Sequence, residues 1–249
     1  EHADAFLFAL GGASWPRLGS DGSWTDSFTA HGATISALKP SNSGFRVPWS
    51  DIFRDRFAGQ PLKPVHVSHG SSEVSGEAIV TQSGIEGGAI YALSATLRDR
   101  IAAEGSADLV LDLSPNLTAA ELAKKIAYAP SGTSTANRLR RAGLTPIAAS
   151  LLRERRGGPG LPTAPAELAA IAKACVIELT GVAPIERAIS TAGGISWDSI
   201  NNDYSLKSDL RTFVAGEMLD WEAPTGGYLL QACFATGRAA AHGMLERLT

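Results

Sequence analysis

The chain has 249 residues, of which 44% are hydrophobic and 19% charged, and its formal net charge at pH 7 is −3. These values predict a globular protein of one large or two modest domains, and the small net charge gives no overall attraction to nucleic acid or to an acidic membrane. No apolar run is long enough to span a bilayer. Cys175 and Cys233 lie far apart in apolar surroundings, which favours free thiols and a cytoplasmic location over a disulfide.

The first predicted element is a strand over the apolar run 5–10, which ends at Gly11-Gly12. Apolar residues at every position, rather than at every second one, indicate a strand buried on both faces, as in the parallel sheet of an α/β protein. The two glycines allow the backbone to pass close to another group. In the loop that follows, Trp15 and Trp24 are interpreted either as covers for a flat ligand or as caps on a core edge.

The stretch from residue 33 has a different pattern, in which apolar and polar residues alternate. The segments 34–38, 62–68 and 75–81 are the clearest cases. Alternation predicts short antiparallel strands with one face in the core. Apolar residues at helical spacing then predict a helix over 89–104.

Two further elements follow closely. The apolar run 109–113 predicts a strand, and the segment 119–127 predicts a helix. Thr118 precedes this helix, and Glu121 follows three residues later, which is the pattern of a capping box. We therefore expect the helix to begin at residue 119.

The stretch 130–160 is the most basic part of the chain, with Glu154 as its single acid. One interpretation is a pair of solvated helices. The other is a patch that binds phosphate groups or an RNA backbone. Its six arginines are Arg138, Arg140, Arg141, Arg153, Arg155 and Arg156.

Near the C-terminus, a short apolar run ends at Gly216-Glu217, and Gly226-Gly227 precede a long apolar segment over 228–248. This order predicts a buried strand, a carboxylate at its tip and a tight turn into a helix. Free backbone N–H groups at the start of that helix suit a ligand with polar or anionic atoms, such as a cofactor. The alternative is an ordinary strand–turn–helix corner.

The pattern along the whole chain predicts an α/β plus α+β protein. A helix is expected over 166–178 and a strand over 185–190. The α/β pattern occupies the two ends of the chain, and a mixed, partly antiparallel pattern lies between them. This indicates one domain, formed by 1–30 and 190–249, that is interrupted by an insert over 31–189.

The side chains offer little reactive chemistry of their own. The histidines are scattered, so no metal site is expected, and neither a hydrolase triad nor a phosphate-binding P-loop can be assembled. What remains is a set of glycine turns at strand ends. In an open α/β sheet ligands lie outside the carboxyl ends of the strands, so these turns predict a site lined by backbone. Such a site suits a cofactor that supplies its own chemistry.

Several motifs together resemble the BaiN-like, or aminoacetone-oxidase-like, family of FAD-dependent oxidoreductases. The likeness covers essentially the whole chain and is strongest to a poorly characterised bacterial branch that carries Pro-Trp-Ser, here residues 48–50. Each motif alone is weak, but their combination in this order is specific. The motifs are 10–16 with 19–22, 57–64, 76–87, 191–195, and 215–220 with 226–228 and Gln231.

The resemblance implies a partial Rossmann-like FAD-binding domain at the chain ends and a β-barrel-like insert with helices that covers the substrate. It places Glu217 at the ribityl chain or near the pyrophosphate of FAD. It implies that hydride passes through the flavin to or from a small-molecule substrate, and it makes NAD(P)H a candidate partner. It identifies no catalytic side chain. The implied cofactor contacts are Gly11, Gly12, Ala13, Gly194, Gly216, Glu217, Gly226, Gly227 and Tyr228.

One departure from the family pattern matters. The glycine-rich strand–turn–helix that grips the ADP half of FAD is expected before residue 1 and is absent from the sequence. We therefore expect a fragment that binds FAD weakly or not at all on its own, with a homodimer or another chain completing the outer sheet. The alternative is an RNA- or protein-binding module that uses the Arg138–Arg156 region and has no independent catalysis.

Overall fold

The computed structural model describes residues 3–158 and 160–249, which form two compact units. The terminal unit contains the described residues up to Ser43 together with Ala183–Thr249, and the central unit is Gly44–Val182. The expected roles of a cofactor domain, over 1–30 and 190–249, and of an insert, over 31–189, stay predictions.

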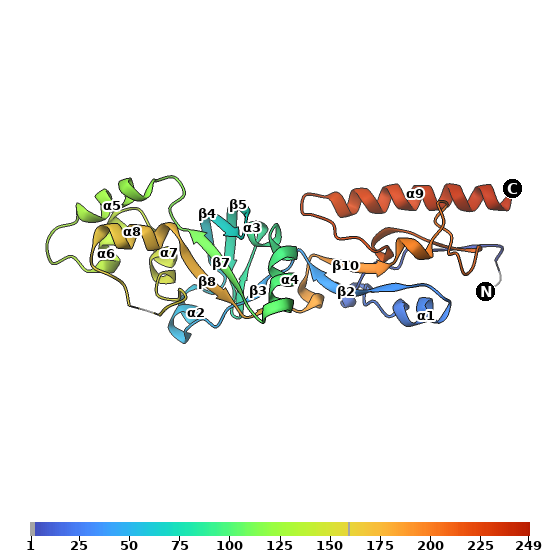
Figure 1. The fold of residues 1–249 in the computed structure, drawn as a ribbon, viewed down its shortest axis with the longest axis horizontal. Coiled ribbons are helices and arrows are strands. Elements are labelled where there is room, and N and C mark those ends of the chain that lie inside the picture. The colour runs from blue at the N-terminus through green and yellow to red at the C-terminus, as the bar shows by residue number, and fades with distance from the viewer. Residues whose placement is uncertain (1–2, 159) are drawn as a thin grey trace. The chain divides into compact units, whose positions relative to one another are not determined.

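The terminal unit contains two small ladders and one long helix. A parallel ladder joins β1 to β11, and α9 contacts this ladder and the turn after β11. An antiparallel ladder joins β2 to β10 (Figure 1). The elements are β1 (Phe6–Phe8), η1 (Pro16–Leu18), α1 (Trp24–Ala30), β2 (Ile35–Ser41), η2 (Ile185–Arg187), β10 (Ser190–Ile195), η3 (Trp197–Ser199), β11 (Thr212–Val214), η4 (Gly216–Met218) and α9 (Tyr228–Leu248), where η marks a 3₁₀ helix.

The strand predicted over 5–10 is present as β1, but its predicted burial on both faces is wrong. Phe6 and Leu7, whose side chains point to opposite faces, are each 38% exposed. The reason is that the described residues give β1 a single ladder partner, β11. Phe8 packs edge-on against Phe28 of α1 at 5.4 Å between ring centroids, so part of one face is covered.

The core of the terminal unit lies between α1, β10 and the turn after β11. Trp24 is buried in it and donates its indole N–H to the carbonyl oxygen of Gly11 at 3.0 Å. Of the two interpretations for Trp24, the structure supports the core position. Trp15 is exposed.

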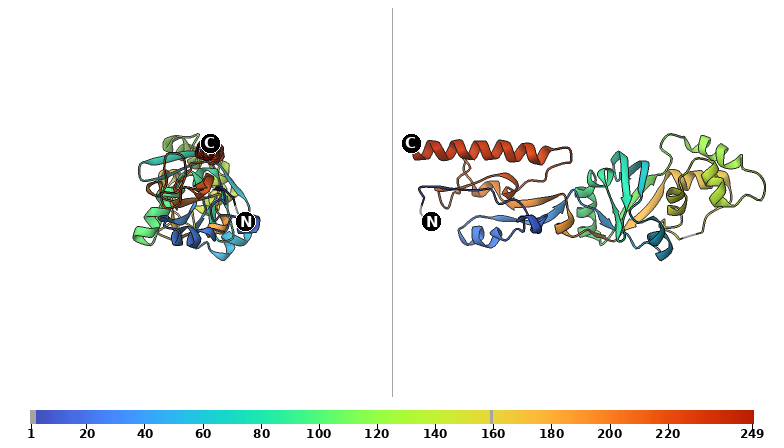
Figure 2. Two further views of the ribbon diagram at one scale, coloured as in Figure 1. Left: turned by 90° about the vertical axis from the view of Figure 1, so that its right-hand side faces the viewer. Right: turned by 180° about the vertical axis from the view of Figure 1, so that it is seen from behind.

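The central unit is built on one seven-stranded antiparallel sheet with the order β8-β7-β4-β5-β6-β3-β9. The alternating segments 62–68 and 75–81 are confirmed as strands, and they form the longest ladder of the sheet. Helices α5 to α8, coloured yellow-green to amber, gather together in both Figure 1 and Figure 2. The elements are β3 (Phe45–Arg46), α2 (Asp51–Phe57), β4 (Pro61–His69), β5 (Ser72–Val80), β6 (Gly84–Glu86), α3 (Gly88–Tyr91), α4 (Ser94–Glu104), β7 (Ala107–Asp112), α5 (Ala119–Ala127), α6 (Thr135–Arg141), α7 (Pro146–Leu151), α8 (Pro165–Lys173), β8 (Cys175–Leu179) and β9 (Gly181–Val182).

The sheet is open, so the expected barrel-like insert is wrong. No ladder among the described residues joins β8 to β9, the two edge strands. The two edges are nevertheless consecutive in the chain, because only Thr180 separates β8 from β9. One extended segment therefore pairs with β7 along its first part and with β3 along its last part. The two-residue strands β3 and β9 are too short to carry a continuous closing ladder.

Three predicted elements differ from the structure. The helix over 89–104 is divided into α3 and α4, and the strand over 185–190 is a 3₁₀ turn followed by β10. The helix over 166–178 ends at Lys173, because the last part of that segment belongs to β8, which pairs with β7. Val176 and Ile177 favour an extended backbone, and this pairing overrides the helical pattern.

The cysteine prediction is confirmed, since Cys175 and Cys233 are both free. Burial in the core of the central unit raises the pKa of the Cys175 thiol to about 12. Its sulfur therefore acts as a small apolar group at neutral pH.

The predicted capping box is confirmed at the start of α5. Thr118 Oγ1 accepts the N–H of Glu121, and the Glu121 carboxylate accepts the N–H of Thr118 at 2.8 Å. Leu122 and Ile126 then place the buried face of α5 in the core. The local sequence thus sets where this helix begins.

Replacing Thr118 with Ala should lower the free energy of unfolding by about 1 kcal/mol, because the first turn of α5 loses an acceptor. Denaturant unfolding followed by circular dichroism measures this change. Thr118→Ser keeps the hydroxyl and is the matched control. Equal stability of the Ala and Ser variants would contradict the capping role.

Candidate functional site

The glycine turns of the terminal unit meet around one carboxylate, that of Glu217. Its Oε1 accepts the backbone N–H of Thr191 at 2.9 Å, and its Oε2 accepts the backbone N–H of Gly12 at 3.2 Å. These partners lie 26 and 205 positions away in the chain. The carboxylate therefore joins the turn after β1, the strand β10 and the turn after β11 at a single point.

A second acceptor in the same place is the hydroxyl of Thr191, which is buried. Its Oγ1 accepts the N–H of Ala13 at 2.8 Å and the N–H of Ser14 at 3.2 Å. Three successive backbone N–H groups, from Gly12 to Ser14, thus donate to side chains of β10 and η4. The loop after β1 is held by these bonds rather than by regular secondary structure. We call this assembly of residues 11–14, Thr191 and Glu217 the glycine corner.

Close approach explains why glycine is needed at two of these positions. A Cβ on Gly12 would lie 2.3 Å from Thr191 Oγ1, and a Cβ on Gly194 would lie 2.4 Å from the carbonyl oxygen of Met218. Gly194 also has a φ of +134°, which is strained for other residues. Both glycines are thus required by contacts inside the protein.

Helix α9 packs on the glycine corner through its second and third turns. The hydroxyl of Thr236 accepts the N–H of Gly216 at 3.0 Å, and Cys233 lies beside Gly216 and Glu217. Gly226, Gly227 and Tyr228 stand at the start of this helix, one turn or more away along its axis. The structure thus brings Gly11, Gly12, Ala13, Gly216 and Glu217 together, with Gly194 three residues further along β10.

The start of α9 and the loop after η1 offer polar groups to a bound molecule. Gly227 has no side-chain cap, and a Cβ on it would meet nothing within 4 Å. The first N–H groups of the helix thus have no side-chain acceptor at the N-cap. The hydroxyl of Ser20 is buried without a hydrogen-bond partner and lies 2.9 Å from where a Cβ on Gly11 would stand. These donors fit a cofactor with polar atoms.

Burial raises the pKa of Glu217 above its ordinary value of 4.5, and the N–H groups of Thr191 and Gly12 offset part of this rise. The carboxylate is thus poorly solvated but hydrogen-bonded. Burial of Cys233, together with the nearby charge of Glu217, raises the pKa of the Cys233 thiol. Both groups favour their neutral forms more than they would in water.

Four of the six arginines of the basic stretch make internal side-chain contacts, among them Arg140, which donates to the side-chain oxygen of Asn137. Arg138 donates to the carbonyl oxygens of Ile126 and Thr163, and Arg155 donates to those of Leu152 and Gly160. Arg156 forms ion pairs with Asp108 and Glu178. These internal contacts agree with the interpretation of the basic stretch as a pair of helices. They give no support to an RNA- or protein-binding module.

Residues 1–243 match the family described as HI0933-like protein Rossmann domain. The chain belongs to this family. The expected resemblance is therefore confirmed at the level of the family and of a mixed α/β fold with a Rossmann-like domain.

A distant relative has a described activity. The chain is 25% identical over 259 residues to the 3-dehydro-bile acid delta(4,6)-reductase of Clostridium scindens, and the match covers 98% of the chain. The chain spans 63% of the length of that relative. In the part of the chain that the structure describes, no helix combines the length and the apolarity needed to cross a membrane.

Two residues of the site were not among the predicted contacts. Thr191 was noted only as part of a motif, and Ser20 only as part of the loop motif 19–22. Neither residue carries a local signal for its role, because the bonds of Thr191 cross 177 and 178 positions of the chain. The roles predicted for the nine cofactor contacts stay predictions.

Replacing Thr191 with Val should remove the acceptor for the N–H groups of Ala13 and Ser14 while keeping the side-chain volume. We expect the free energy of unfolding to fall by about 1–3 kcal/mol, the cost of leaving a buried donor unpaired. Hydrogen exchange at these two amides should accelerate. Thr191→Ser retains the hydroxyl and should keep both amides protected; unchanged exchange in the Val variant would refute the bond network.

The raised pKa of Glu217 predicts the direction of a pH effect on stability. Because the folded state holds this proton more tightly than the unfolded chain does, its contribution is fully present below pH 4.5 and is lost as the pH rises through the folded pKa. The stability of the wild type relative to Glu217→Gln should therefore fall between pH 4.5 and 7, as measured by urea unfolding. Glu246→Gln, at an exposed position of α9, is the control for loss of one negative charge. If the free energy of unfolding of the wild type instead rose relative to that of Glu217→Gln as the pH increased, the prediction would be wrong.

Proposed function

We propose that the chain binds the flavin end of FAD as an FAD-dependent oxidoreductase. The observation that carries the proposal is the glycine corner: three distant segments converge on Glu217 in a chain whose family is a Rossmann-domain family. The distant relative's name, a reductase, supports the same reaction class.

In this proposal, the residues of the chain bind and orient the cofactor. The uncapped N–H groups at the start of α9, after Gly226 and Gly227, hold an electron-rich edge of the flavin, since a helix N-terminus stabilises negative charge. The Ser20 hydroxyl donates to a polar atom of the cofactor. Glu217 holds the glycine turns in place and does not bind the cofactor itself, because both of its carboxylate oxygens already accept backbone N–H groups.

When bound, FAD supplies the redox chemistry, as a two-electron carrier of hydride. The protein supplies position, a dry surrounding and fixed dipoles. We propose NADH or NADPH as the reductant and a small conjugated molecule as the acceptor. Since the chain spans 63% of the relative's length, the activity, the substrate and the partners of the whole protein are parts of this proposal.

Ser20→Ala provides the test. Removing a buried hydroxyl that has no partner in the protein should leave the free energy of unfolding unchanged or slightly higher. If the hydroxyl binds FAD, the same change should weaken FAD binding about five- to tenfold, the loss expected for one hydrogen bond. Quenching of flavin fluorescence, titrated with the purified chain, measures the affinity.

The matched control is Ser43→Ala, because among the described residues Ser43 is the second with a buried hydroxyl that has no partner, and it lies outside the glycine corner. It should leave FAD affinity unchanged. Absence of saturable FAD binding to the wild-type chain would count against the proposed function, whereas equal binding by all three proteins would remove only the role of Ser20. Reduction of the bound flavin by NADH or NADPH is then read from its absorbance.

A further inference from the structure

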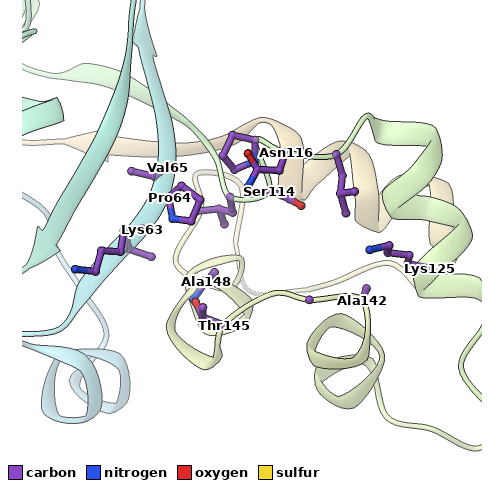
Figure 3. A pocket seen from close by; sticks show the side chains of 14 residues that line it. Lys63, Pro64, Val65, Ser114, Asn116, Lys125, Ala142, Thr145 and Ala148 are labelled. Atoms are coloured by element: carbon purple, nitrogen blue, oxygen red, sulfur yellow. The ribbon is translucent and has the colours of Figure 1, made fainter.

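The central unit contains a cavity where two strands of its sheet separate. The strands β4 and β7 are paired from Ser68 to His66, and the last pair is His66 with Asp112. Beyond it the chain leaves the ladder as the loop 113–117, and a cavity of about 280 Å³ opens between this loop, β4 and the segment from α6 to α7 (Figure 3). Splayed strands leave backbone groups and side chains directed at the space between them.

The loop that borders the cavity is held in place from the other side. The N–H of Leu113 donates to the carbonyl oxygen of Ala172 at 2.9 Å. The ammonium of Lys173 donates to the carbonyl oxygens of Ser114 and Leu117 and forms an ion pair with Asp112 at 2.6 Å. The cavity is therefore shaped by the fold itself. The same ion pair neutralises Asp112, the residue that directly precedes the loop.

One wall of the cavity is apolar. Leu62, Val65, Leu113 and Ala148, all buried, line it from three different elements. This wall gives a bound molecule a surface on which a short hydrocarbon can leave water, at about 25 cal/mol per Å².

The opposite side is polar and includes the ammonium of Lys125, which also interacts electrostatically with Glu121 of the same helix. The side chain of Lys125 extends from α5 toward the cavity, while Ser114 and Asn116 lie on the bordering loop (Figure 3). Among the described residues no carboxylate lies within ion-pair distance of Lys125. By contrast, the ammonium of Lys63 lies 3.6 Å from Glu77, and the Glu121 carboxylate accepts the N–H and O–H of Thr118.

We propose that this cavity binds a small monocarboxylate with a short hydrocarbon body. The carboxylate pairs with Lys125, and the body lies on the wall formed by Leu62 and Leu113. A volume of about 280 Å³ is at the small end for ligand pockets, so an acid of about six to eight carbons suits it.

The lining selects a carboxylate over a phosphate. Among the described residues no arginine lines the cavity, so the paired donors that recognise phosphate are absent from it, and one of its two lysines, Lys63, already pairs with Glu77. The proposal is independent of the proposed function, because every residue of the cavity lies in the central unit and binding can be measured without flavin.

The experiment titrates hexanoate, with hexan-1-ol as the neutral analogue of equal chain length, into the full chain labelled with ¹⁵N. Amide shifts should map to residues 113–117 and 142–148, and hexanoate should bind more tightly than hexan-1-ol. Lys125→Met should weaken hexanoate binding about fivefold and leave hexan-1-ol unchanged, because it removes the charge and keeps an apolar stem.

The matched control is Lys124→Met, which removes the same charge from the neighbouring exposed position of α5 and should leave both affinities unchanged. A second variant, Asn116→Asp, places a negative charge at the border and should weaken hexanoate alone. Circular dichroism checks that each variant is folded. Absence of hexanoate binding, shifts confined to other residues, or equal losses in the Lys124 and Lys125 variants would overturn the proposal.

Discussion

The terminal unit depends on one carboxylate that holds two distant backbone groups. Glu217 accepts N–H groups from Gly12 and Thr191, and around these bonds three segments meet that share no continuous sheet. A buried carboxylate is costly unless its oxygens are hydrogen-bonded, and here both are. The same bonds satisfy donors that the irregular loop after β1 would otherwise leave unpaired. The loop and the acid therefore stabilise each other, and neither is well placed without its partner.

These contacts explain why glycine is needed at some positions of the terminal unit. Gly12 and Gly194 are needed because side chains and backbone of the protein come within 2.3–2.4 Å of the position that a Cβ would occupy. Gly227, in contrast, faces open space. A glycine-rich pattern thus contains two kinds of position: those that let the protein pack against itself and those that leave its backbone accessible.

Local signals predicted much of the fold. The capping box of Thr118 and the alternation in β4 and β5 depend on neighbours in the chain, and the structure follows them. The segment 175–178 lies in strand β8, where a helix is predicted, because its partner, β7, lies more than 60 positions away. The candidate site also contains features that local sequence predicts and features that it does not. The glycine turns were visible as motifs, whereas the bonds of Thr191 and the unpaired hydroxyl of Ser20 arise from long-range packing that no local pattern encodes.

The two edges of the central sheet have a consequence for how the protein is made. The segment that runs through Thr180 pairs with β7 and, two residues later, with β3, whose partner residues are Phe45 and Arg46. During synthesis, β3 to β6 leave the ribosome early, but β3 receives its second neighbour only when residue 182 has emerged. Until then one edge of the growing sheet is unprotected, and such edges are prone to pair with other chains. The last strand of the central unit therefore covers β3 and itself becomes the edge of the finished sheet, where only two residues take part in the ladder.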